Sequence, residues 1–114
     1  MKKTYQFGLL AEKIEALFLR LKGYQILQSR YKNHFGEIDI IAKKSRVIIF
    51  VEVKARKSKT TIEEMLSQRQ IQRIERAAEF FIAKNSQFHN FDWRIDFIEV
   101  GRFFLPKHHC NFVS

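Results

Sequence analysis

The sequence predicts an α/β fold, one domain in which helices flank a mixed β-sheet. The chain has 114 residues, the length of one domain. Helical and strand patterns follow one another in the order helix, strand, strand, strand, helix, strand. The third strand opens on five consecutive apolar residues, Val47–Val51, as a strand buried on both faces does. We therefore expect residues 1–114 to form a single domain around this strand.

The first helix is expected from Phe7 to Lys22, with Gly23 just past its end as a cap residue. Its apolar stripe at helical spacing consists of Leu10, Ile14, Leu17, Phe18 and Leu21. Glu12 lies roughly opposite this stripe, in a second row that is also largely apolar. The helix is therefore expected to pack on two sides, with Glu12 either at the rim of a site or solvated.

Three strands are expected after this helix. Tyr24–Tyr31 forms the first, and two runs rich in β-branched residues, Gly36–Ala42 and Val47–Arg56, form a hairpin. The polar residues between these two runs predict a two-residue turn at Lys44-Ser45.

This turn sets the register of the predicted hairpin. It places Asp39 opposite Phe50, and Glu37 opposite Glu52. Because side chains alternate between faces, one face then carries Glu37, Asp39, Glu52 and Lys54. Asp39 and Glu52 become diagonal neighbours, with Cα atoms roughly 7–8 Å apart, and can hold one divalent cation between them. The alternative is an ordinary Glu52–Lys54 ion pair at a strand end, beside a solvated Asp39.

These residues resemble a known signature. Asp39, then twelve residues, then Glu52-Val53-Lys54 resembles the Asp…Glu-x-Lys pattern of the PD-(D/E)XK nuclease superfamily. The longer wording Gly36-Glu37-Ile38-Asp39-Ile40-Ile41 with Phe50-Val51-Glu52-Val53-Lys54-Ala55-Arg56 resembles the small bacterial YraN-like family, from about Phe7 to Val100. Members of that family are predicted endonucleases similar in fold to archaeal Holliday-junction resolvases. The resemblance implies a restriction-endonuclease-like fold and an acidic residue of the first helix, here Glu12, near a metal.

The resemblance also implies roles for the residues of the signature. Asp39 and Glu52, together with the Val53 carbonyl, would hold Mg²⁺ or Mn²⁺. The ion would activate water and stabilise charge on the scissile phosphate. Lys54 would orient the water or bind the phosphate. The family usually has a lysine where this chain has Gln70, which can form hydrogen bonds but carries no charge.

Basic residues follow the predicted site strand. Arg56, Lys57 and Lys59 form a positively charged loop that would lie along a phosphate backbone. A helical stretch is expected from Thr61, at the start of a capping-box pattern, to Lys84, with or without a break. Its buried stripe consists of Ile71, Ile74, Ala78, Phe81 and Ile82. Its opposite face carries Arg69, Arg73, Arg76 and Phe80, a row that suits either nucleic acid or plain solvent.

The C-terminal part predicts two further segments of the sheet. Trp93–Val100 alternates as a strand, and Phe103–Phe112, which contains Pro106, is expected at an edge. Three soft-metal ligands are adjacent in this tail: His108, His109 and Cys110. Adjacent ligands suit neither helix nor strand geometry, and no second pair lies at zinc-finger spacing, so we expect no structural zinc site.

Composition narrows the classes of partner and compartment. Lysine and arginine number 21 against 12 acidic residues, a net charge of +9, which is usually retained for nucleic acid or an acidic membrane surface. The single Cys110 fits a reducing compartment. No apolar run approaches the roughly 20 residues that span a bilayer. The chain is expected in the cytoplasm, with no membrane partner.

Together with these patterns, the resemblance implies a metal-dependent nuclease acting on nucleic acid, with DNA favoured and branched DNA among the candidate substrates. One alternative is a non-catalytic nucleic-acid-binding module that retains the fold, which the uncharged Gln70 favours. A further alternative is an interaction subunit that forms a homodimer through the apolar tail residues Phe103, Phe104 and Phe112.

Overall fold

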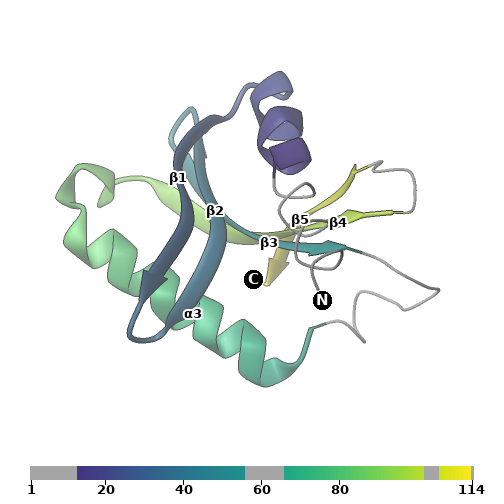
Figure 1. Cartoon of the computed structure of the whole chain (residues 1–114). Helices are drawn as coiled ribbons and strands as arrows, with labels where there is room; N and C mark the ends of the chain where they lie inside the picture. Colours follow the sequence, from purple (N-terminus) through teal and green to yellow (C-terminus); the bar gives the residue numbers. More distant parts are fainter. Residues whose placement is uncertain (1–12, 56–65, 102–105, 114) are drawn as a thin grey trace.

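A five-stranded sheet, in the order β1-β2-β3-β4-β5, forms the middle layer of the molecule in the computed structural model (Figure 1). The structure describes residues 13–55, 66–101 and 106–113. A helix over residues 13–21 comes first. The labelled elements are β1 (Gln25–Asn33), β2 (Gly36–Lys44), β3 (Val47–Ala55), α3 (Gln68–Lys84), the short 3₁₀-helix η1 (Ser86–Phe88), β4 (Asp92–Val100) and β5 (Pro106–Val113).

The sheet is mixed, as the sequence predicts. β1–β2, β2–β3 and β4–β5 pair antiparallel, whereas β3 and β4 are parallel. Parallel neighbours cannot be joined by a tight turn, and α3 lies in the connection between them. β5 stands at one end of the strand order, which confirms an edge strand in the tail.

Helices cover both faces of the sheet (Figure 1). α3 packs on one face, where Ile74 and Phe81 join a core cluster with Phe50 of β3. The helix over residues 13–21 covers the other face, where Leu19 joins a second cluster with Val51. Because both faces are covered, residues 48–51 of β3 are fully buried, which confirms the central strand.

The turn between β2 and β3 lies one residue later than predicted. Lys44 pairs with Val47, so the loop is Ser45-Arg46. The first residue of a two-residue hairpin loop needs a positive φ, and Ser45 adopts one, at 54°. Lys44 remains in the strand, where its Nζ donates a 2.8 Å hydrogen bond to the Lys22 carbonyl at the end of the N-terminal helix.

The corrected register changes the predicted partners. Phe50 pairs with Ile41 instead of Asp39. Because the partner changes by two residues, a register change of this size leaves Asp39 and Glu52 on a shared face. Continuing this register one residue beyond the last pair, Ile40 and Val51, brings Asp39 beside Glu52, and the two side chains share a hydrogen bond. The two acids are therefore direct neighbours across the strands, and the predicted diagonal arrangement is wrong.

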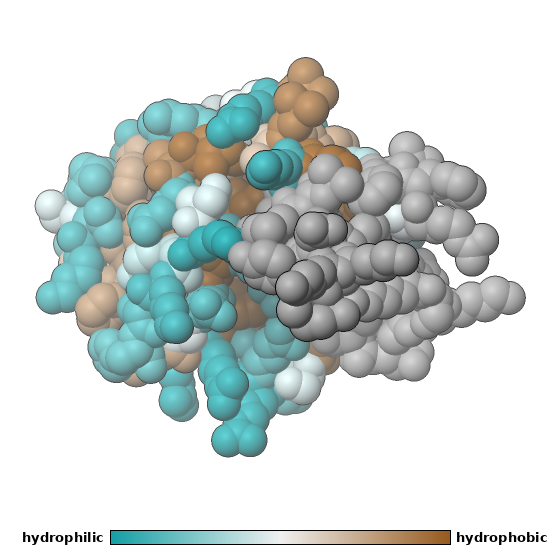
Figure 2. Space-filling model, in the orientation of Figure 1, coloured by the Kyte–Doolittle hydropathy of each residue, from teal (hydrophilic) through white to brown (hydrophobic). Residues whose placement is uncertain are grey.

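The N-terminal helix packs on the sheet mainly through the second of its two predicted apolar rows, together with Phe18 of the first. Leu17 and Leu21 of the expected stripe are 57 % and 79 % exposed, whereas Leu19 and Glu15 are fully buried. Leu19 and Ala16 belong to the second apolar row, and they pack against the sheet. The sheet already carries large side chains, so close packing favours the row with the smaller Ala16. In Figure 2 exposed apolar atoms gather at the top, where this helix lies in Figure 1.

The end of this helix is as predicted. Gly23 has a φ of 97°, the left-handed conformation of a cap residue. The Tyr24 amide donates to the Leu19 carbonyl and the Gly23 amide to the Arg20 carbonyl, both at 3.0 Å. These two bonds form a Schellman cap.

α3 follows its predicted pattern. Its N-cap is Ser67, whose hydroxyl accepts a 3.1 Å hydrogen bond from the Gln70 amide, while the capping box at Thr61 lies outside the described residues. Ile74, Ala78 and Phe81 are buried, which confirms most of the stripe. None of the helices in the described ranges is long and apolar enough to cross a membrane.

Candidate functional site

A pocket of about 370 Å³ lies where β2 and β3 meet the first turns of α3. It is lined by Gly36, Glu37, Asp39, Glu52, Lys54, Gln70, Arg73 and Ile74. The four charged strand residues predicted to share a face all reach this one pocket. They do so on the α3 side of the sheet, because Glu52 and Lys54 alternate in step with Phe50 of the α3-side core.

Asp39 marks the point where β2 and β3 separate. The pairing of the two strands runs as far as Ile40 and Val51. Beyond it, the Val53 amide donates a 2.8 Å hydrogen bond to Asp39 Oδ2 instead of a backbone carbonyl. The carboxylate thus replaces one bond of the ladder, and the strands are free to diverge around the pocket.

Glu52 is largely shielded from water in the pocket, with 12 % of its side chain exposed. Its Oε2 accepts a 2.7 Å hydrogen bond from Gln70 Nε2 of α3 and lies 3.4 Å from Lys54 Nζ. Burial, followed by the charge of Asp39 and a hydrogen bond with it, raises the pKa of Glu52 from 4.5 to about 8, against an opposing effect of Lys54. The pair therefore holds a proton at neutral pH unless a cation replaces it.

The donor set fits a hard divalent cation. Asp39 and Glu52 offer carboxylate oxygens, the ligands that Mg²⁺ prefers. The N–H and C=O of one strand residue point to the same side, so the Val53 carbonyl faces the side on which Asp39 lies. Like charges in contact, partly shielded from water, are unfavourable without a counterion. The pocket can thus hold one cation between β2 and β3.

The predicted basic residues have different positions. Arg73 lines the pocket, and its Cβ would lie 3.4 Å from a Cβ built on Gly36. Arg69 is exposed in the first turn of α3. Four further predicted residues lie outside the described ranges: Glu12, Arg56, Lys57 and Lys59.

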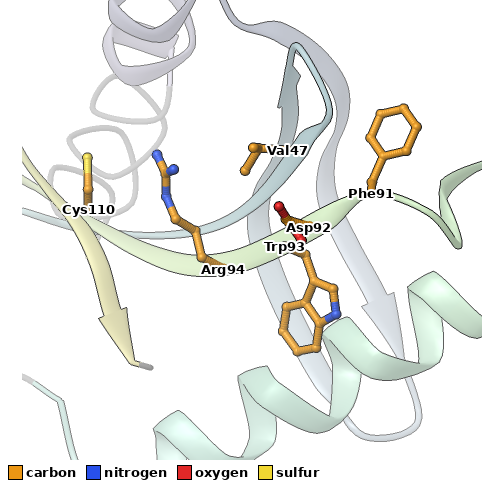
Figure 3. A pocket seen from close by; sticks show the side chains of 6 residues that line it. All are labelled: Val47, Phe91, Asp92, Trp93, Arg94 and Cys110. Carbon is orange, nitrogen blue, oxygen red and sulfur yellow. The ribbon is translucent and has the colours of Figure 1, made fainter.

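A second, larger hollow of about 640 Å³ lies near the start of β4 (Figure 3). It is lined by Val47, Phe91, Asp92, Trp93, Arg94 and Cys110. Figure 3 shows the Arg94 side chain on the same side of β4 as Cys110 of β5. One carboxylate lines this hollow, and the paired acids lie in the smaller pocket, so we take the smaller pocket as the functional site.

A group of potential metal ligands lies beside this second hollow. Asp96 Oδ2 lies 2.7 Å from His108 Nε2, and Cys110 Sγ lies 3.7 Å from the same nitrogen. Sequence reasoning missed Asp96 as a third ligand, because the strand pairing that brings it there is not visible in the tail. His109 points elsewhere, to Glu99 at 3.1 Å.

The same group has a counterion of its own. Arg94 Nε and Nη2 donate to the two oxygens of Asp96 at 2.9 and 3.2 Å. A fully buried carboxylate that accepts a two-point contact from a guanidinium is already neutralised. This group therefore has less need of a cation than the Asp39–Glu52 pair.

Comparison with known proteins gives a family. The sequence model of "Uncharacterised protein family UPF0102" matches residues 11–100. A UPF0102 protein of Rhodopseudomonas palustris is 42 % identical over 105 residues, which cover 92 % of this chain and 80 % of that protein. A UPF0102 protein of Rhizobium etli is 36 % identical over 107 residues, which cover 94 % of this chain and 88 % of the relative.

Proposed function

The chain belongs to the UPF0102 family, and we propose that it is a metal-dependent nuclease of restriction-endonuclease-like fold that hydrolyses phosphodiester bonds, with DNA as the favoured substrate. One observation carries the proposal. Two carboxylates, Asp39 and Glu52, meet in a pocket beside Lys54, and the pKa of Glu52 is raised to about 8. Perturbed acids in a pocket are typical of functional sites.

The proposed metal is Mg²⁺ or Mn²⁺, held by Asp39 and Glu52 with the Val53 carbonyl. When bound, it would supply Lewis acidity toward a phosphate oxygen and toward water. The carboxylates would give up their shared proton to bind it, because a ligand oxygen must be ionised. Glu37, which lines the pocket and is exposed, would bind the ion through water.

The other pocket residues would act on the substrate. The Lys54 side chain is about one-third exposed and its Nζ lies close to Glu52, so it can place a positive charge beside a phosphate. Gln70 donates to Glu52 and holds that carboxylate in place. Arg73 at the pocket wall would bind a neighbouring phosphate through its guanidinium.

The charge of the whole chain supports a polyanionic substrate. A net charge of +9 raises the local concentration of nucleic acid near the pocket. Branched DNA stays among the proposed substrates, and the cytoplasm is the proposed compartment.

A second candidate is a nucleic-acid-binding module that does not cut. It is favoured by the uncharged Gln70, which donates to Glu52 where a lysine would add a positive charge. Both candidates predict binding, and they differ in hydrolysis.

Cleavage assays distinguish the two candidates. Wild type should nick supercoiled plasmid or a four-way junction with Mn²⁺ or Mg²⁺, and excess chelator should stop it. Lys54→Ala should lose cleavage while it retains most of its DNA affinity, because one lysine is a small part of the total charge. Lys13→Ala, which removes an equal charge from an exposed position of the N-terminal helix, is the matched control and should still cut. Equal cutting by Lys54→Ala, or no metal-dependent cutting by wild type, would favour the binding module.

A further inference from the structure

Three aromatic rings form a cluster on the surface beside the pocket. The ring centroids of His34 and Phe35 are 4.0 Å apart, and Phe80 of α3 lies 5.1 Å from His34 and 5.9 Å from Phe35. His34 is exposed, Phe35 is 38 % exposed and Phe80 is partly exposed. Core packing does not account for the cluster, because none of these rings belongs to either core cluster of the described residues. We refer to His34, Phe35 and Phe80 as the aromatic platform.

The platform is held in place by the contact between the β1–β2 turn and α3. Asn33 Nδ2 donates to the Ala77 carbonyl at 3.3 Å, and Asn33 Oδ1 accepts from the Phe35 amide at 2.9 Å. Figure 1 shows this turn beside the middle of α3. The rings are therefore arranged before any ligand arrives, and little side-chain entropy is lost when a flat molecule stacks on them.

Two basic residues of α3 lie near the platform. Lys84 Nζ lies 5.5 Å from the centroid of the Phe80 ring. Arg76, one turn before Phe80 on α3, is exposed. Aromatic rings beside cations are the surface on which single-stranded nucleic acids stack their bases and place their phosphates. An apolar protein partner would not need these charges.

The platform continues the proposed catalytic pocket. Arg73 lines that pocket and packs on Gly36, one residue after Phe35. Phe80 lies seven residues beyond Arg73, on the same side of α3, a rise of about 10 Å. That distance is roughly three stacked nucleotides at about 3.4 Å each.

We propose that the aromatic platform binds unpaired bases, so that the pocket acts on nucleic acid with a single-stranded segment a few nucleotides from the scissile phosphate. This inference rests on the proposed function, and it narrows the substrate class. Bases inside a duplex are stacked on their neighbours and cannot offer a free face to the platform. A fully paired duplex would therefore bind through its phosphates alone.

The test compares binding to labelled single-stranded and duplex DNA of equal length, by fluorescence anisotropy at one fixed salt concentration. The double variant Phe35→Leu, Phe80→Leu keeps apolar bulk but removes two stacking faces. We expect its affinity for the single strand to fall roughly tenfold or more, and its affinity for the duplex to change less than twofold. Phe35→Tyr, Phe80→Tyr restores the faces and should restore single-strand affinity.

Phe91→Leu is the matched control. Phe91 also lies beside two cations, with Arg46 at 4.7 Å and Lys43 at 5.8 Å from its ring centroid, but it lines the second hollow. This variant should keep the affinity of wild type for both DNAs. Circular dichroism and Trp93 fluorescence show whether each variant is folded.

Two results would overturn the proposal that the platform binds unpaired bases. One is an unchanged affinity of the double Leu variant for the single strand, and the other is an equal loss of affinity for single-stranded and duplex DNA. A change of oligomeric state with unchanged DNA affinity would instead make the patch a self-association surface. Failure of the proposed function is distinguishable, because metal-dependent thermal stabilisation depends on the acidic pocket around Asp39 and Glu52 and not on the aromatic platform. If wild type prefers single-stranded DNA but never cuts, the proposed platform would stand and the proposed nuclease activity would be rejected.

Discussion

Glu52→Gln should stabilise the metal-free protein at high pH while it abolishes the response to metal. This combination is unusual, because most substitutions of a buried hydrogen-bonded residue destabilise. Glutamine has nearly the shape of glutamate, its Oε1 can still accept from Gln70, and its amide can donate to Asp39. It removes the negative charge that the site must otherwise neutralise.

The pKa of Glu52 gives the magnitude. It is about 8 in the folded protein and 4.5 as the ordinary value, so the folded state binds the proton more tightly. The stability gained from this proton is present below pH 4.5 and is lost as pH rises to about 8. The difference of about 3.5 units corresponds to about 5 kcal/mol at about 1.4 kcal/mol per unit, an upper limit because glutamine also exchanges charged hydrogen bonds for weaker ones.

The assay is thermal unfolding at pH 6 and pH 9, each with chelator and with excess Mn²⁺. At pH 9 without metal, Glu52→Gln should unfold several degrees above wild type, since 1 kcal/mol shifts the midpoint by roughly 4 °C in a domain of this size. At pH 6 the difference should be smaller, at most about 2 kcal/mol, because that pH lies only 1.5 units above the ordinary pKa of 4.5. Mn²⁺ should stabilise only wild type, by about 3 kcal/mol of unfolding free energy at a hundredfold excess over Kd, and raise its midpoint accordingly.

Glu15→Gln is the control for this experiment. Glu15 is fully buried in the N-terminal helix, burial raises its pKa to about 8, and neither oxygen has a hydrogen-bond partner among the described residues. Its substitution should also stabilise the protein above pH 8, but it should leave the metal response and cleavage intact. The reasoning fails if Glu52→Gln still responds to Mn²⁺, or if it unfolds below wild type at pH 9.

Three further predictions concern the same pocket. Asp39→Asn should remove the metal-dependent shift in unfolding temperature and cleavage, yet unfold cooperatively without metal, and a retained metal shift would contradict the site. Gln70→Lys should lower the pKa of Glu52 and increase the cleavage rate by roughly fivefold. The reason is that a charged donor bonds a carboxylate about 1 kcal/mol more strongly than a neutral donor. An unchanged or lower rate in the plasmid assay would contradict this role of residue 70. Arg73→Glu should weaken binding to all DNA sequences alike. It should also reduce the slope of the logarithm of affinity against the logarithm of salt concentration by about 1 or more. An unchanged slope would exclude a phosphate contact at Arg73.

The shared face of Asp39 and Glu52 could be predicted because it depends only on the alternation of side chains along each strand. Alternation along a strand has period two, so any hairpin register that differs by two residues leaves Asp39 and Glu52 on one face. The buried character of β3 was equally accessible, since residues 47–51 are apolar without interruption. The exact residue pairs between β2 and β3 could not be predicted, because the position of the turn depends on which residue adopts a positive φ. Ser45 does so, and no glycine or asparagine in the turn indicates it.

The face of the N-terminal helix could not be predicted for a different reason. That helix carries two apolar rows, and which one packs depends on the shape of the sheet beneath it. Nothing in the sequence indicates that α3 places Gln70 against Glu52. The two residues are 18 positions apart, and their contact depends on the angle at which α3 packs on the sheet. The adjacency of His34 and Phe35 was visible in the sequence, but their contact with Phe80 follows only from the way the β1–β2 turn crosses α3.

Asp39 has two tasks, and this decides how the site should be tested. Its Oδ2 accepts from the Val53 amide, which lost its backbone partner where the strands diverge. Asp39→Ala would leave that partly buried amide unsatisfied, at a cost of up to about 1–3 kcal/mol, so any loss of metal binding would be confused with a loss of structure. Asparagine keeps an oxygen for the amide and removes only the charge. The Asp39 carboxylate therefore contributes to the pocket in two ways: it accepts from the Val53 amide where the strand pairing ends, and it places a negative charge beside Glu52. Asp39→Asn keeps the first contribution and removes the second.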